Sequence, residues 1–230
     1  MSQTRLISAF LFALFPLMPS VFGLPAPAGW SELANCRLSS TEYSDGDSFY
    51  VVHDGKTHLF RLYFVDCPET DDRFPDRLAA QGEAFGLGTA GVMAAGRQAA
   101  KFTTKLLARP FTVYTKWVDA RGASKQQRFY AVIMVGGKNV ASELIRNGWA
   151  RAYGMPADFP TAAGGKSFAK ELRRLQAQAI REKAGAFSGS TKVLAAGETE
   201  VPEEEFIDHE SELGATIIQD GIGDLEINFN

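Results

Sequence analysis

A short part of the sequence combines four acids and one arginine in an arrangement that could carry out chemistry. Asp45 and Asp47 are two positions apart, so their side chains lie on the same face wherever the backbone is extended. Arg61 lies inside an apolar stretch that ends at Asp66 and Glu69. A charge inside a hydrophobic strand is costly unless an anion pairs with it. Arg61 therefore requires an anionic partner, which either the protein or a ligand must supply.

These residue types together favour phosphodiester chemistry. A tight turn at residues 54–55 is expected to bring Asp47 and Asp66 together, and carboxylate oxygens are the ligands that Ca²⁺ and Mg²⁺ prefer. The planar guanidinium of Arg61 would hold phosphate oxygens in fork geometry. Glu69, three residues past Asp66, would act as a base or orient a water molecule.

Each feature also has a purely structural explanation. An Asp-Gly-Asp segment alone is more commonly a surface turn than a metal site. Arg61 alone could form a structural ion pair with Glu143 or Asp45. The joint presence of this segment, the arginine and the acids that follow it favours the chemical interpretation.

The elements that must position these residues are short strands. Residues 48–53 and 59–65 are rich in β-branched and aromatic side chains. Residues 54–55 between them are Asp-Gly, a strong hairpin signal because both positions tolerate positive φ. Residues 111–118 alternate large apolar or Thr side chains with others, as a half-buried strand does, and residues 129–135 predict a further strand.

Helices are expected around and after these strands. One ends before Pro110, and another spans residues 140–147 and closes at Gly148. A third has an apolar stripe over residues 168–179, with Ser167 available as its N-cap. The order of elements predicts an α+β fold, a small five-stranded antiparallel β-barrel decorated by about three helices.

The candidate site resembles that of the staphylococcal nuclease family. The resemblance rests on Asp-Gly-Asp-Ser at 45–48, Phe-Arg-Leu-Tyr-Phe-Val-Asp-Cys-Pro-Glu-Thr at 60–70, residues 96–107 as a helix after the barrel, Arg128 at the head of a later strand, and residues 143–153. It covers residues 35–185 in the same order. The arginine and Asp-x-Pro-Glu, joined to Asp-Gly-Asp, form a specific combination.

The resemblance implies an OB-fold barrel and a Ca²⁺-dependent endonuclease that acts on DNA, RNA or both and leaves 3′-phosphates. It implies three groups of site residues: the metal ligands Asp47, Asp66 and the backbone carbonyl of Cys67, the catalytic residues Arg61, Glu69 and Arg128, and the substrate-binding residues Lys125 and Tyr153. Among the catalytic residues, the acid activates or orients the attacking water and the two arginines grip the phosphate.

The sequence departs from the family pattern in three places. Residues 126–127 are Gln-Gln where the family usually has Tyr-Gly before the second arginine, so an aromatic that could stack on a base is missing. Cys67 stands where threonine is common, a change that a backbone ligand tolerates. Residues 70–95 form a longer stretch than in short relatives and are expected to make a lid or rim.

Both ends of the chain differ in composition from its body. Residues 1–28 have a short positive start, an apolar run and small residues, which indicates a secretory signal and export to the periplasm or outside the cell; an uncleaved membrane anchor is the alternative. Residues 33–188 are expected to form the nuclease domain. Residues 189–230 are expected to form an acidic tail that is partly disordered.

Charge divides the chain along the same lines. Residues 31–190 carry 22 Lys and Arg against 16 Asp and Glu, whereas residues 191–230 carry one Lys against 11 acids. The whole-chain net charge of −3 therefore hides a mildly basic body, which suits a nucleic-acid substrate.

Composition narrows the remaining possibilities. With 45% hydrophobic and 22% charged residues, the chain is neither wholly disordered nor a multi-span membrane protein. Cys36 and Cys67 are too few for a disulfide scaffold, and whether they pair is left open. We expect a monomer without a stable membrane partner once the signal is removed.

Two other functions remain open. One is a catalytically weak OB-type nucleic-acid binding module that keeps the fold and has lost the chemistry. The other makes the acidic tail the functional part, which docks a partner or covers the basic cleft as a nucleic-acid mimic.

Overall fold

The computed structural model describes residues 29–39, 45–121, 126–158, 164–194 and 197–201. The predicted signal segment and most of the predicted acidic tail lie outside these residues, as does Lys125. None of the helices in the described ranges is both long and apolar enough to cross a membrane.

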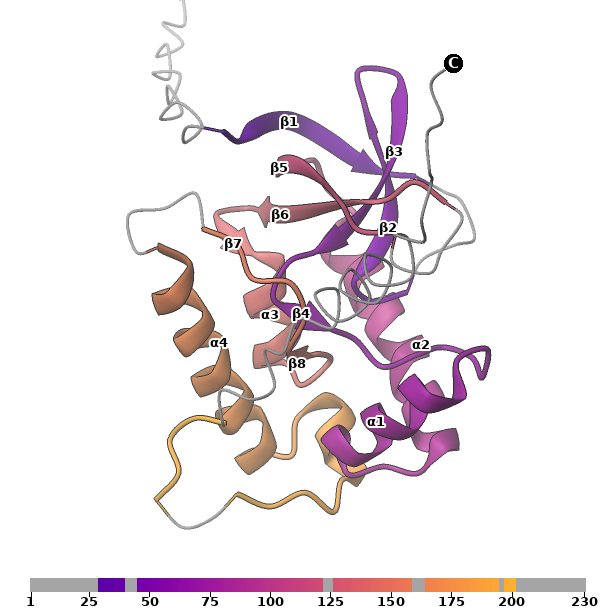
Figure 1. The fold of residues 1–230 in the computed structure, drawn as a ribbon, viewed down its shortest axis with the longest axis vertical. Coiled ribbons are helices and arrows are strands. Elements are labelled where there is room, and N and C mark those ends of the chain that lie inside the picture. Colours follow the sequence, from indigo (N-terminus) through magenta and orange to yellow (C-terminus); the bar gives the residue numbers. More distant parts are fainter. Residues whose placement is uncertain (1–28, 40–44, 122–125, 159–163, 195–196, 202–230) are drawn as a thin grey trace, which may run out of the picture.

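Five strands form the barrel in the upper part of Figure 1. They are β1 (Ser31–Leu38), β2 (Ser48–His53), β3 (Lys56–Leu62), β5 (Phe111–Asp119) and β6 (Phe129–Val135). The antiparallel neighbours are β1–β2, β2–β3, β1–β5 and β5–β6, and a parallel pairing of β3 with β6 closes the ring.

The predicted α+β OB-fold barrel is confirmed, with two refinements. The barrel was expected to be antiparallel, but its closing pair is parallel. A closed ring with an odd number of strands cannot alternate direction all the way round, so at least one neighbouring pair must be parallel. Four α-helices, rather than about three, accompany the barrel in the described residues.

The β2–β3 hairpin forms as predicted. Asp54 and Gly55 have φ values of 47° and 73°, which is the pair of positive φ angles that a tight two-residue turn needs. The register pairs Ser48 with Arg61. This register brings the start of β2, and the residues just before it, beside the end of β3.

Strand β1 was not among the predicted strands. Its sequence, Ser-Glu-Leu-Ala-Asn-Cys-Arg-Leu, contains no β-branched or aromatic residue, so propensity gave no signal. Asn35 adopts a positive φ of 57° where the pairing with β5 shifts register. This irregularity turns Cys36 fully into the core.

The helices lie below the barrel in Figure 1. They are α1 (Pro75–Phe85), α2 (Thr89–Leu106), α3 (Val140–Arg146) and α4 (Gly164–Arg181), with a short 3₁₀ helix η1 (Gly185–Gly189). Short strands β4 (Val65–Asp66) and β8 (Arg151–Ala152) pair with each other between the barrel and the helices, and β7 (Lys138–Asn139) extends the hairpin from β6.

Three local predictions need correction. Ser167 does not cap α4, because the helix begins at Gly164. The helix after the barrel begins at Thr89, earlier than expected. Trp117 leaves the buried face of β5, where a positive φ of 57° and a register shift interrupt the alternation, and it is 37% exposed.

A second small core lies among the helices. Phe85, Phe187, Ile180 and Val201 are among its buried members. The segment that approaches Val201 is tied to the body, since the Thr191 amide donates to the carbonyl of Gly86 at 3.0 Å. The chain therefore packs against the body beyond residue 188.

Both cysteines have free, buried thiols. Burial raises the pKa of Cys36 to about 11 and the pKa of Cys67 well above its usual value. Nearby carboxylates, Asp47 first among them, add to the effect at Cys67. Both side chains behave as small apolar residues of the core.

Candidate active site

The site begins where the hairpin register brings Arg61 beside two carboxylates. Arg61 Nη2 lies 3.4 Å from Asp66 Oδ1 and 4.0 Å from Asp47 Oδ2. The Asp47 and Asp66 side chains are 3% and 1% exposed, and that of Arg61 is 15% exposed. The sequence-based requirement for an anionic partner is thus met by two aspartates. The alternative partner Glu143 instead pairs with Lys138 and Arg146.

Asp47 is held by the backbone at the exit of β4. Its Oδ2 accepts from the amide of Cys67 at 2.8 Å, and its Oδ1 accepts from Ser48 Oγ at 3.0 Å. The neighbouring Gly46 must be glycine, because a Cβ there would lie 2.6 Å from Cys67 Sγ. The Asp-Gly-Asp segment therefore packs closely against Cys67, which directly follows the strand that carries Asp66.

Asp66 is the most heavily paired acid of the site. Besides Arg61, it contacts Arg77 Nη2 at 2.5 Å through Oδ1 and Arg151 Nε at 2.9 Å through Oδ2. The β4–β8 pairing places Arg151 directly opposite Asp66. Burial opposes ionisation, but Arg77, Arg151 and Arg61 together hold the pKa of Asp66 well below its usual range.

Glu69 lies beyond the strand exit with its carboxylate on Arg77. Arg77 Nε is 2.8 Å from Glu69 Oε1. Burial raises the pKa of Glu69, opposed first by Arg77 and assisted by Asp47. The backbone of Glu69 packs closely against α2 at Gly96, since a Cβ at Gly96 would lie 2.2 Å from the Glu69 carbonyl oxygen.

Arg128 reaches the site through Ser48. Its Nη1 donates to Ser48 Oγ at 3.3 Å, and that hydroxyl in turn donates to Asp47. Its Nε and Nη2 donate to the carbonyls of Ala120 at 2.8 Å and Arg121 at 3.5 Å. The guanidinium is therefore near the carboxylates but is largely held by the backbone.

The sequence of this chain matches the model of a known protein family. A family model described as staphylococcal nuclease homologue matches residues 59–188, more than half of the chain. The chain belongs to the staphylococcal nuclease homologue family. A search of curated proteins returned no match.

This membership confirms the resemblance seen in the sequence, and with it a fold of the nuclease and nucleic-acid binding type. The matched segment begins at Leu59, so it includes Arg61, Asp66 and Glu69. Asp45 and Asp47 precede it, and the hairpin register brings the segment that carries them beside Arg61.

Three residues of the site were missed by sequence reasoning: Arg151 of β8, described above, and Arg77 and Gln81 of α1. Arg77 bridges Asp66 and Glu69. Gln81 Nε2 donates to Asp66 Oδ2 and to the Cys67 carbonyl, each at 2.9 Å, and Gln81 Oε1 accepts from the Glu69 amide at 2.7 Å. For Arg77 and Gln81, the one signal in the sequence was their spacing of four residues, which places two side chains on the same face of a helix.

Of the predicted substrate-binding residues, the structure describes only Tyr153. Its ring lies under the guanidinium of Arg151, whose Cζ is 4.0 Å from the ring centroid, and its amide donates to the Phe64 carbonyl. Tyr153 thus borders the site through Arg151. Burial raises the pKa of Tyr153.

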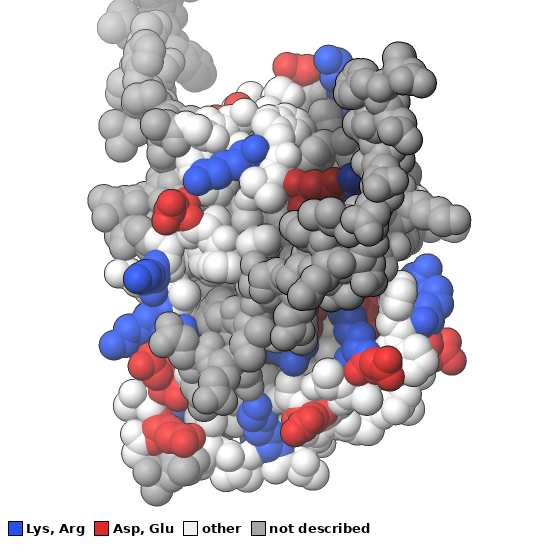
Figure 2. Space-filling view, viewed as in Figure 1, with Lys and Arg blue, Asp and Glu red and all other residues white. Residues whose placement is uncertain are grey.

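This staphylococcal nuclease homologue site contains four acids and four arginines, but burial, followed by the charge of Asp47, raises the pKa of Asp45 to about 8, so Asp45 is largely protonated at neutral pH. Its acids are Asp45, Asp47, Asp66 and Glu69, and its arginines are Arg61, Arg77, Arg128 and Arg151. Figure 2 likewise shows Lys and Arg interspersed with Asp and Glu on this face, rather than one basic patch.

The oxygen donors fit a hard cation in type, but side chains of α1 already donate to those of Asp66 and Cys67. Asp47, Asp66 and the Cys67 carbonyl supply oxygens of the kind Ca²⁺ takes. Both oxygens of Asp66 and the Cys67 carbonyl accept from Arg or Gln side chains. Within the described ranges, no three or more His, Cys, Asp or Glu side chains are grouped so that they could hold a metal ion.

A cavity elsewhere on the barrel is separate from these residues. It has a volume of about 560 Å³ and is lined by Tyr63, Lys116, Met155, Lys166 and Arg173, among others. None of the paired acids and arginines lines it. The chemistry of the site therefore belongs to the barrel rim beside α1.

Proposed function

We propose that this protein is an exported, Ca²⁺-dependent endonuclease that hydrolyses phosphodiester bonds of DNA, RNA or both and leaves 3′-phosphates. One observation carries the proposal. Arg61 lies within 4.0 Å of both Asp47 and Asp66 in a chain of the staphylococcal nuclease homologue family. A phosphate gripped by this arginine would lie beside the oxygens suited to a cation.

Three groups would hold the cation in this proposal. They are the carboxylates of Asp47 and Asp66 and the backbone carbonyl of Cys67. When bound, Ca²⁺ would neutralise charge on a phosphate oxygen and so lower the barrier to attack. The side chains of the site would then have to position the phosphate and the attacking water.

The arginines would bind and stabilise the phosphate. Arg61 is held in place by Asp47 and Asp66, so its fork is oriented before substrate arrives. Arg128 approaches from the start of β6, next to the parallel pairing of Phe129 with Phe60. Preorganised charge of this kind is the main protein contribution to phosphoryl chemistry.

Glu69 would accept the proton of the attacking water or orient that water. Burial raises its pKa, which makes its carboxylate a stronger base. A product with a 3′-phosphate requires that the bond between phosphorus and the 5′ oxygen breaks. The water would therefore attack on the side opposite that oxygen.

The second candidate function is a catalytically weak OB-type nucleic-acid binding module. The observation that favours it is that Glu69 and Arg128 already have partners within the protein. Glu69 is paired with Arg77, and Arg128 donates to two backbone carbonyls. If these pairs persist with substrate bound, the protein would bind a nucleic acid without cleaving it.

Export and a monomeric state complete the proposal and rest on the sequence. The signal-like composition of residues 1–28 supports delivery to the periplasm or to the outside of the cell. A cleaved signal would leave no stable membrane partner. Substrate binding in this setting would depend on Lys125 and Tyr153.

The experiment that tests the proposal is cleavage of a labelled oligonucleotide by purified protein without residues 1–28. Reactions with Ca²⁺, with Mg²⁺ and with a chelator would be compared, and the product ends would be mapped. Cleavage that requires Ca²⁺ and leaves 3′-phosphates supports the proposal. Binding without cleavage in every cation supports the binding module.

A further inference from the structure

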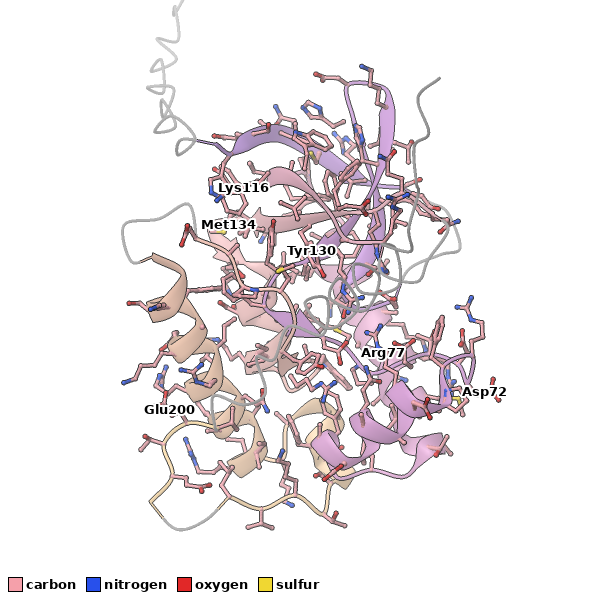
Figure 3. The ribbon with its side chains drawn as sticks, in the orientation of Figure 1. Asp72, Arg77, Lys116, Tyr130, Met134 and Glu200 are labelled. Atoms are coloured by element: carbon pink, nitrogen blue, oxygen red, sulfur yellow. The ribbon has the colours of Figure 1, made fainter. Side chains whose placement is uncertain are left out.

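Arg77 occupies an unusual place among the charges of the site. Its Nη2 lies 2.5 Å from Asp66 Oδ1 and its Nε lies 2.8 Å from Glu69 Oε1. One guanidinium thus bridges the proposed metal ligand and the proposed base. Figure 3 shows Arg77 between α1 and the barrel.

Helix α1 presents this bridge together with a second donor. Pro75 begins the helix, so Arg77 lies in the first turn and Gln81 one turn later. Gln81 donates to Asp66 Oδ2 and to the Cys67 carbonyl. Two side chains of one helix face therefore cover the oxygens of Asp66, Cys67 and Glu69 that face α1.

Loss of Arg77 would remove the nearest positive charge from two carboxylate oxygens. Asp66 Oδ1 would keep Arg61 at 3.4 Å, and Glu69 Oε1 would lose the guanidinium nitrogen that lies 2.8 Å away. A cation that bound there would replace the charge that Arg77 supplies.

Exposure separates Arg77 from the other arginines on Asp66. The Arg77 side chain is 36% exposed, whereas those of Arg61 and Arg151 are 15% and 9% exposed. Of the three arginines on Asp66, Arg77 is thus the most accessible to solvent, so water can most easily replace its contacts with the acids.

We propose that Arg77 is an internal cation that competes with Ca²⁺ for the carboxylate of Asp66 and holds Glu69 at the same time. It pairs with both acids while no ion is bound, and it must leave Asp66 for the ion to bind. This inference rests on the proposed Ca²⁺ site. It makes Arg77 a residue that sets the concentration of Ca²⁺ at which the site fills.

The test is calorimetric titration of the purified protein with CaCl₂, for wild type and for Arg77→Met. Methionine keeps the length and apolar stem of the side chain and removes the guanidinium. We expect Arg77→Met to bind Ca²⁺ about tenfold more tightly or better, which corresponds to about 1.4 kcal/mol. Equal or weaker binding by Arg77→Met would overturn the inference.

Arg97→Met is the matched control for loss of a positive charge. Arg97 is exposed on α2, and its Nη1 donates to the carbonyl of Thr70 at 3.2 Å, one residue beyond Glu69. Its removal takes away a nearby charge without releasing Asp66 or Glu69. A gain in affinity as large as that of Arg77→Met would show that general charge, and not competition, is responsible.

Thermal unfolding gives a second reading from the same proteins. Loss of the contacts of Arg77 with Asp66 and Glu69 should lower the Tm of Arg77→Met in chelator. Ca²⁺ should raise the Tm of this variant more than that of wild type, because tighter binding stabilises the folded state more. If Arg77→Met does not fold, Arg77→Gln takes its place. A Ca²⁺-induced rise no larger than in wild type contradicts the inference.

A parallel cleavage assay separates this inference from the proposed function. Ca²⁺-dependent cleavage with equal Ca²⁺ affinity in wild type and Arg77→Met would overturn the inference alone. Absence of Ca²⁺ binding in both proteins, up to about 10 mM, would overturn the inference and the proposed Ca²⁺ dependence together, since extracellular sites bind in the millimolar range or more tightly.

Discussion

Arg61 is the residue at which the two aspartates of the site meet, with distances of 3.4 Å to Asp66 and 4.0 Å to Asp47. We predict that Arg61→Lys lowers the rate of cleavage by about 10² to 10³, because a lysine keeps the charge but loses the planar fork. Single-turnover kinetics would measure this loss. A loss of less than about tenfold would mean that Arg61 serves the fold more than the reaction.

At the residue scale, the paired acids and Arg61 could be predicted from the sequence because the Asp-Gly turn sets their register locally. Arg77, Gln81 and Arg151 could not. Their contacts with Asp66 depend on where α1 and β8 pack. No local pattern encodes that placement.

At the element scale, α2 must approach the loop that carries Glu69, and Gly96 makes this approach possible. A Cβ at Gly96 would lie 2.2 Å from the Glu69 carbonyl oxygen and 2.5 Å from that of Pro68. We predict that Gly96→Ala destabilises the protein by about 1–3 kcal/mol through overpacking, although alanine normally favours a helix. It should also lower cleavage by displacing Glu69.

Gly91→Ala, five residues earlier on the same helix, is the control. A Cβ there would meet Leu87 at ordinary contact distances of 3.4 Å or more. Alanine should therefore stabilise by up to about 1 kcal/mol. Chemical unfolding of both variants would measure the difference, and similar effects at the two positions would contradict the close approach.

The β2–β3 hairpin also carries a pH-sensitive group. His58 packs on Trp117 with ring centroids 5.2 Å apart, and burial, followed by His53 and Lys56, lowers the pKa of His58. The unfolded chain then binds more protons below the ordinary histidine pKa of about 6.5, so stability should fall as pH drops through that window.

Two measurements check this prediction. An NMR titration should place the midpoint of His58 below about 6.5. Unfolding at several pH values should show that wild type loses stability on acidification relative to His58→Gln, in which this proton is absent. A midpoint at or above the ordinary value would refute the prediction.

Elements differed in how far the sequence could predict them. The hairpin was predicted because both turn positions tolerate positive φ. β1 was missed because its residues lack strand propensity and it is held by pairing on both edges with β2 and β5. Trp117 left the expected face because a backbone irregularity, which alternation cannot reveal, precedes the end of β5.

At the scale of the whole molecule, the packed body extends past the boundary expected at residue 188. Val201 is 1% exposed in the second core, and Arg181 Nη1 donates to the Glu198 carbonyl at 3.1 Å. We predict that a chain ending at residue 189 is less stable than one ending at residue 201 by at least about 2 kcal/mol, from the lost burial of Val201 and its neighbours.

Unfolding of the two truncated proteins in denaturant would test this. The full-length chain is the reference. Equal stability of the two truncations would show that the last described segment adds nothing to the fold. The same proteins would test the acidic tail, because an occluding tail requires cleavage to rise when residues 202–230 are removed.

The sequence predicted that the strands form a small barrel, but it did not predict that the pair of strands that closes the barrel is parallel. Strand propensity predicts individual strands, whereas the parallel β3–β6 contact follows from closing five strands into a ring. The family match agrees with this architecture. The pairing of acids with arginines from α1 and β8 emerges only once the helices have packed below the barrel.

The central claim is that this site cleaves a phosphodiester. Its most direct test is single-turnover cleavage of a labelled oligonucleotide in saturating Ca²⁺ by wild type and Glu69→Gln, with binding of the same oligonucleotide measured by anisotropy. We predict that both proteins bind it, and that Glu69→Gln cleaves at least about 100-fold more slowly. Equal cleavage by both proteins, or binding by both with no cleavage by wild type, would contradict the claim.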